Sequence, residues 1–165
     1  MTPLLLSLTL ATGLGACGGD DKDKDTKVTT ETSTPGGQKT EGTAVSLKAA
    51  LNPADEVPGP GAKDGVGAGL VDVAGTKVCS DLKVTMGEKP TKAHIHQGAK
   101  GTSGPVVVDL MPSFTAGEAA YTSKTCVEAP AEKAADLIAN PAGYYLNVHS
   151  DGHPDGAMRG QLATF

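Results

Sequence analysis

A regular alternation between residues 78 and 86 constrains this chain more than any other feature. One set of alternating positions is apolar apart from a single serine: Val78, Ser80, Leu82, Val84 and Met86. The positions between them are polar or small: Cys79, Asp81, Lys83 and Thr85. Successive side chains of a β-strand point to opposite faces, whereas a helix repeats every 3.6 residues. The segment therefore predicts a strand with one face in a core and the other toward solvent.

Seven further segments are predicted to form strands. They span residues 45–51, 66–73, 93–96, 105–110, 119–127, 144–149 and 157–164. The apolar run at 105–110 is expected to be a buried strand. One helix is expected at 131–139, because Pro130 can open it and Asn140-Pro141 stops it. The 22 glycines and 11 prolines suit many short strands joined by turns. We predict an all-β fold, an antiparallel Greek-key-like β-sandwich of about eight strands and one short helix.

The N-terminus predicts export. Residues 3–14 are apolar or small, but the run is too short for a bilayer-spanning helix of about 20 residues. Its length is typical of a signal peptide, although no Lys or Arg precedes Lys22. The sequence Leu14-Gly15-Ala16-Cys17 follows and resembles the lipobox of bacterial lipoproteins. The resemblance implies removal of residues 1–16 and lipidation of Cys17. An ordinary signal peptide with an unmodified Cys17 is the alternative.

The segment after Cys17 predicts a tether. Residues 20–25 alternate in charge and a Thr-rich, Gly-containing stretch follows, so little apolar area is available for a core. We expect residues 17–42 to be the lipidated Cys and a flexible linker, and 43–165 to be the folded domain. The expected location is extracytoplasmic, anchored in the lipid bilayer through Cys17. The net charge of −5 argues against a nucleic-acid partner. We expect the partner to be an extracytoplasmic protein or ligand.

Cysteine count and export together predict a disulfide. If Cys17 carries lipid, then Cys79 and Cys126 remain as a pair in an oxidising compartment. Their bond closes a long loop and is worth roughly 4 kcal/mol in the chain-entropy model. Two buried free thiols are the alternative. A cysteine-based metal site is not expected, because no pair of cysteines has metal-binding spacing.

Three stretches together resemble the CHRD domain, first described as a repeat in chordin. They are NPADEVP at 52–58, AHIHQGAKGTSGPVVV at 93–108, and YYLNVHS at 144–150 continuing to MRGQL at 158–162. The resemblance covers about residues 45–165. Ala157 stands where the family usually has Glu, and Ser150 where Thr is commoner. The resemblance implies a β-sandwich module without an established enzymatic activity.

Three histidines form a candidate site. His94 and His96 are two apart and share one face of a strand, and His149 lies on the penultimate strand. If these strands are neighbours, the three imidazoles converge, and three His ligands suit Zn²⁺ or Cu²⁺. A purely structural hydrogen-bond cluster and a proton-transfer site are the alternatives. We expect Asn147 and Arg159 to support this site, with Arg159 in an ion pair or capping carbonyls.

The functional prediction is a membrane-tethered, non-enzymatic binding or structural surface domain. The alternative is a His-cluster protein that binds Cu or Zn and is redox-active in the manner of Cu/Zn superoxide dismutase. A hydrolase is not favoured, because adjacent Ser150, His149 and Asp151 point apart on a strand. The glycines of residues 98–104 lack the Lys-Ser/Thr ending of a phosphate-binding loop, so we interpret them as a turn.

Overall fold

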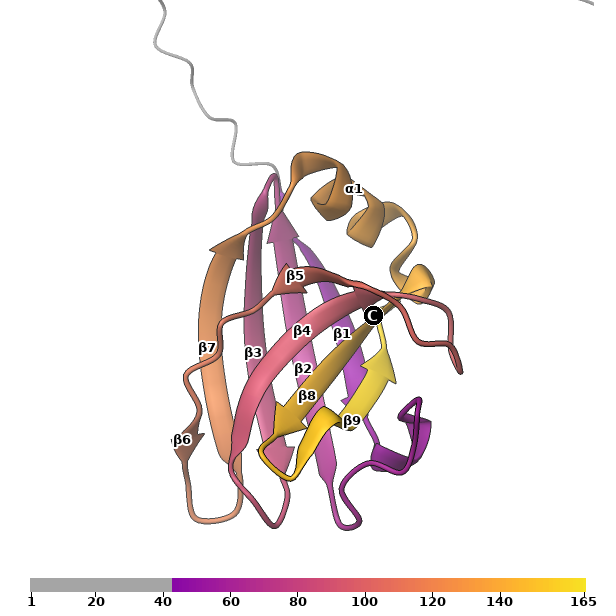
Figure 1. Ribbon diagram of the computed structural model, residues 1–165. Helices are drawn as coiled ribbons and strands as arrows, with labels where there is room; N and C mark the ends of the chain where they lie inside the picture. Colours follow the sequence, from indigo (N-terminus) through magenta and orange to yellow (C-terminus); the bar gives the residue numbers. More distant parts are fainter. Residues whose placement is uncertain (1–42) are drawn as a thin grey trace, which may run out of the picture. The chain divides into compact units, whose positions relative to one another are not determined.

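A computed structural model describes residues 43–165, which form two antiparallel β-sheets packed as a sandwich (Figure 1). The larger sheet has six strands in the order β10-β1-β2-β3-β7-β6. Their bounds are β1 Val45–Leu51, β2 Val66–Ala74, β3 Lys77–Thr85, β6 Thr115–Ala116, β7 Tyr121–Glu128 and β10 Ala163–Thr164. The predicted sandwich is confirmed. The short strand β6 is an addition to the expected strands, and β10 is the end of the strand expected at 157–164, which the structure divides in two.

The smaller sheet has four strands in the order β5-β4-β8-β9. Their bounds are β4 Pro90–Gln97, β5 Val106–Asp109, β8 Tyr144–Ser150 and β9 His153–Gln161. The helix α1 spans Ala131–Ala139, the range expected from sequence, and covers one end of the sandwich (Figure 1). Two single 3₁₀ turns complete the described elements, η1 at Pro53–Asp55 and η2 at Pro141–Gly143.

The core lies between the two sheets and follows the alternation in the sequence. Along β3, Val78, Ser80, Leu82 and Val84 are buried, while the alternate positions Cys79, Asp81 and Lys83 are half-buried or exposed. The smaller sheet contributes Ile95 from β4 and Leu146 from β8 to the same cluster. Burial of this apolar surface is the main stabilising term of such a sandwich.

The expectation of a buried strand at 105–110 is wrong in part. Strand β5 lies at the edge of the smaller sheet, and Val106 keeps 49% of its surface exposed. Only Val108 and Leu110 of this run belong to the core. An apolar run does not distinguish an edge strand from a central one, because position in a sheet depends on which strands pair with it.

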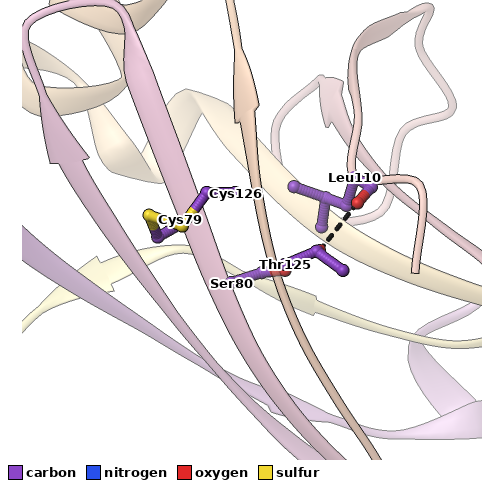
Figure 2. Close-up of a disulfide and its surroundings, with 5 residues drawn as sticks. All are labelled: Cys79, Ser80, Leu110, Thr125 and Cys126. Carbon is purple, nitrogen blue, oxygen red and sulfur yellow. Dashed lines mark hydrogen bonds between the residues drawn. A yellow bond between two sulfur atoms is a disulfide. The ribbon is translucent and has the colours of Figure 1, made fainter. Parts of the chain in front are cut away.

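The predicted disulfide joins Cys79 to Cys126 (Figure 2). The two residues are direct partners across β3 and β7, 47 positions apart in sequence. Their neighbours Ser80 and Thr125 face the other side of the sheet, where the Thr125 hydroxyl donates a 2.8 Å hydrogen bond to the Leu110 carbonyl. The disulfide therefore lies on the outer face of the larger sheet.

The signal peptide, Cys17 and the linker to residue 42 lie outside the described residues, so their predicted roles stay predictions. Within residues 43–165, no helix has the length and apolar character needed to cross a bilayer.

Candidate functional site

The central strand of the smaller sheet is buried on both faces. All seven residues of β8 are buried, although only one face of the sheet meets the core. On the opposite face, polar side chains of β4, β8 and β9 form a continuous group, which we call the polar layer. Its members are His94, His96, Tyr145, Asn147, His149 and Arg159. Residues 52–62 and 98–105 bond to this layer and cover part of it, so several of its polar atoms are buried.

Strands β4 and β8 are neighbours. The three histidines therefore converge, as the sequence predicted for this pairing. Nδ1 of His94 lies 3.0 Å from Nε2 of His149. One ring nitrogen from each of His94, His96 and His149 lies within 4.8 Å of the others. His149 is 8% exposed, and the other two are half-buried. The pairing of β4 with β8 thus assembles three nitrogen donors in one place.

Backbone carbonyls set the tautomers of two of the rings. Nδ1 of His96 lies 2.9 Å from the carbonyl oxygen of Gly104, and Nδ1 of His149 lies 2.9 Å from that of Pro154. A carbonyl oxygen only accepts, so each Nδ1 carries the proton and each neutral ring has its lone pair on Nε2. Nε2 of His96 is buried and has no hydrogen-bond partner among the described residues. The cluster therefore presents lone pairs inward.

Burial keeps the cluster neutral. It lowers the pKa of His94 and His96 below the ordinary value, and it lowers the pKa of His149 to about 4. In each case loss of hydration of the charged ring is the largest cause. Neutral imidazole is the form that binds a metal.

Tyr145 contacts both His96 and Arg159. Its ring stacks on His96 with centroids 4.9 Å apart, and Cζ of Arg159 lies 4.5 Å from its centroid. Arg159 donates from Nη1 to the Thr102 carbonyl at 2.9 Å and from Nε to the Asp55 carbonyl. Arg159 thus caps carbonyls of both covering segments, one of the two structural roles expected for it.

Asn147 connects the layer to a buried carboxyl group. Its Nδ2 donates a 2.7 Å hydrogen bond to Oε1 of Glu56, which is 5% exposed. Loss of hydration raises the pKa of Glu56 to about 7, against the opposing effect of the positive charge of Arg159. Gly156, at φ 142°, makes room for this group, because a Cβ there would lie 2.5 Å from Oε2 of Glu56.

Several contributors were not identified from the sequence. The carbonyls of Gly104 and Pro154 carry no sequence signal, because every residue has one. Oδ1 of Asp109 lies 3.9 Å from Nε2 of His94. Asp109 has this position because β5 pairs with β4. His153 does not join the cluster, since its Nδ1 lies 2.6 Å from Oε1 of Glu88.

The hydroxyl of Ser150 also bonds outside the cluster of His94, His96 and His149. It donates a 2.7 Å hydrogen bond to Oε1 of Glu88, the same oxygen that contacts His153. The Ser150 oxygen also lies 3.3 Å from Nδ1 of His153. A nucleophilic serine gives its proton to a base, whereas the shorter bond here directs the Ser150 proton to the Glu88 carboxylate, which contacts both groups. The contact of Ser150 with Glu88 and His153 is therefore a clamp on the β8–β9 turn.

A comparison with protein-family models places the sequence in a known family. The CHRD domain family model matches residues 47–162, which include every residue of the polar layer. No curated protein and no solved structure matches the chain.

Proposed function

Because this chain belongs to the CHRD domain family, we propose that it is a non-enzymatic binding module held outside the cytoplasm by a lipid on Cys17. The observation that carries the binding role is the polar layer, a group of buried polar side chains assembled from three strands. Nε2 of His96, Oδ1 of Asn147 and Nη2 of Arg159 are buried there without a partner among residues 43–165. Buried polar groups normally have partners, so these atoms favour a role in binding.

The lipid anchor rests on the sequence before the domain. The apolar run of residues 3–14 leads directly into Leu14-Gly15-Ala16-Cys17. Two or three acyl chains anchor a protein stably where one does not. The disulfide between Cys79 and Cys126 supports export, because such bonds persist in oxidising compartments. The linker then places the domain away from the bilayer surface.

Fractionation of a bacterial host tests the anchor. The wild-type chain is expected in the membrane fraction with a lipid-sized mass increase on Cys17, and Cys17→Ser in the soluble extracytoplasmic fraction. Cys79→Ser with Cys126→Ser serves as the matched control, because it removes cysteines without touching the anchor and should stay with the membrane. Identical fractionation of wild type and Cys17→Ser would rule the anchor out.

Metal binding is a second candidate function, favoured by the convergence of three ring nitrogens within 4.8 Å. Three imidazole donors suit Zn²⁺ or Cu²⁺, and a bound Cu²⁺ would open the way to redox activity. The test is elemental analysis of the untagged Cys17→Ser chain, exported to an oxidising compartment. About one equivalent of Zn or Cu is expected, with loss in the His94→Ala/His96→Ala variant. If the protein holds no metal even after reconstitution, the metal-binding function is ruled out and only the proposed binding module remains.

A further inference from the structure

We infer that Zn²⁺ or Cu²⁺ is bound by three particular nitrogens, Nδ1 of His94 and Nε2 of His96 and His149, with Asp109 as the positioning residue for His94. This inference rests on the metal-binding candidate and adds the donor atoms and the outer contacts. It also assigns Asp109 a role that the sequence did not suggest.

His96 and His149 are already oriented as metal ligands. Both rings donate Nδ1–H outward to backbone carbonyls, at 2.9 Å in each case. Histidines that bind metals nearly always donate their second ring N–H to a carbonyl or carboxylate, which fixes the ring and its tautomer. These two rings therefore already have the outer contacts of metal ligands. The Nε2 lone pair of His149 lies 3.0 Å from Nδ1 of His94, and Nε2 of His96 is buried without a partner among residues 43–165.

His94 lies between two acceptors. Its Nδ1 is 3.0 Å from Nε2 of His149, and its Nε2 is 3.9 Å from Oδ1 of Asp109. Without a cation, His94 donates Nδ1–H to His149, and its Nε2 lone pair faces the Asp109 carboxylate. With the proton on Nε2 instead, two lone pairs oppose each other at 3.0 Å, which is favourable only with a cation between them. Metal binding is thus expected to change the His94 tautomer.

The proton balance of this change is simple. Nδ1 of His94 releases its proton to solvent and bonds to the metal, while Nε2 takes up a proton and donates it to Asp109 as a hydrogen bond. The ring stays neutral throughout. Oδ1 of Asp109 accepts a 2.9 Å hydrogen bond from the backbone N–H of Met111, and a carboxylate oxygen can accept a second bond. The Asp109 side chain is 62% exposed, so a small rotation can bring a carboxylate oxygen from 3.9 Å to hydrogen-bonding distance of Nε2 of His94. The resulting order of carboxylate, histidine and metal is a common one in zinc sites.

The spacing of the donor nitrogens fits a tetrahedral metal ion. Metal–nitrogen bonds of about 2.0–2.1 Å place two tetrahedral ligand atoms roughly 3.3 Å apart. The 3.0 Å between Nδ1 of His94 and Nε2 of His149 is close to this value, and one ring nitrogen of His96 lies within 4.8 Å of a ring nitrogen of each of the other two histidines. Ca²⁺ and Mg²⁺ require oxygen ligands, whereas the carbonyl oxygens of Gly104 and Pro154 lie behind the rings as acceptors. The donor set therefore favours Zn²⁺ or Cu²⁺.

Access to the cluster is available from the surface. His149 lines a surface pocket together with Lys92 and Asp151. Three protein ligands leave a tetrahedral ion with one further position. Solvent in this pocket therefore adjoins the His149 ring without unfolding of the covering segments.

The experiment is a titration of the untagged Cys17→Ser chain with Zn²⁺ in a competing chelator. One equivalent is expected to bind, and Asp109→Asn is expected to weaken the Kd by roughly 10- to 100-fold, the usual effect of losing an outer partner. Asp64→Asn is the matched control, since it makes the same charge change at an exposed turn residue and should change the Kd less than twofold. Equal thermal midpoints of the variants exclude a folding effect.

Ring-nitrogen NMR of the same protein with and without Zn²⁺ tests the tautomer change. The proton of His94 is expected on Nδ1 without metal and on Nε2 with it, while His96 and His149 keep theirs on Nδ1. No binding by the wild-type protein would overturn the metal-binding function together with this inference. One equivalent bound with an unchanged His94 tautomer, or with Asp109→Asn behaving like Asp64→Asn, would overturn this inference alone.

Discussion

The side-chain amide of Asn147 donates a 2.7 Å hydrogen bond to the carboxyl group of Glu56, 91 positions earlier in the chain. The bond joins the central strand β8 to the segment after η1 and closes the polar layer on one side. It also explains how a carboxyl group tolerates burial at 5% exposure, because a buried polar group without a partner costs several kcal/mol.

Glu56→Gln is expected to remove a pH dependence of stability. The pKa of Glu56 is about 7 in the folded protein against an ordinary 4.5, so the folded state holds more protons between these values. Stability should therefore fall as pH rises from about 4.5 to about 7, by up to roughly 3 kcal/mol, and change no further above this range. Gln keeps an acceptor for Asn147 but cannot ionise.

Urea unfolding of both proteins between pH 4.5 and 8 measures this effect. The slope attributed to Glu56 should be absent in Glu56→Gln, which should be the more stable protein at pH 8. Glu118→Gln provides the control, because Glu118 is exposed and its replacement should leave the wild-type slope intact. Parallel pH profiles for wild type and Glu56→Gln would contradict the prediction.

Arg159→Lys is expected to destabilise the domain although the charge is kept. The guanidinium group bonds the carbonyls of Asp55 and Thr102 and lies over the ring of Tyr145. A lysine has a single ammonium group and lacks this planar fork. We expect a loss of roughly 2–4 kcal/mol in the free energy of unfolding, measured by chemical denaturation. A change below about 0.5 kcal/mol would mean that these bonds contribute little.

The double variant Cys79→Ser/Cys126→Ser is expected to lose roughly 4 kcal/mol. The bond constrains residues 47 positions apart, so its removal chiefly gives the unfolded chain more freedom. Both cysteines lie on the outer face of the larger sheet, so serine at these positions leaves no core cavity. Unfolding midpoints of the oxidised wild-type and variant proteins give the value, and equal midpoints would exclude a stabilising role.

Gly160→Ala is expected to distort the junction of the two sheets. A Cβ at Gly160 would lie 2.0 Å from the backbone carbonyl oxygen of Ala50, so β9 and β1 must move apart. We expect a loss of at least roughly 2 kcal/mol, since such overpacking cannot relax through a side chain. Gly87→Ala is the matched control, because nothing lies within 4 Å of its Cβ position. Thermal unfolding compares the two, and similar midpoints would refute the close approach.

Local sequence patterns were sufficient for the helix and for most of the strands, whereas the short strand β6 was not predicted. The alternation from Val78 to Met86 predicted which side of β3 is buried, and the Pro130 to Asn140 signals predicted the bounds of α1. These features depend on residues a few positions apart. The edge position of the strand at 105–110 was not predicted, because apolar content alone does not separate an edge strand from a central one.

The sequence by itself determined the strand faces, the helix and the residue types of the candidate site. The tertiary structure decided that β4 pairs with β8, which places His94 beside His149 from 55 positions away. It also decided that Glu56 contacts Asn147, and that the carbonyls of Gly104 and Pro154 orient two of the rings. The physical reason is that side-chain periodicity is local, whereas pairing and register depend on how the whole chain buries its apolar faces.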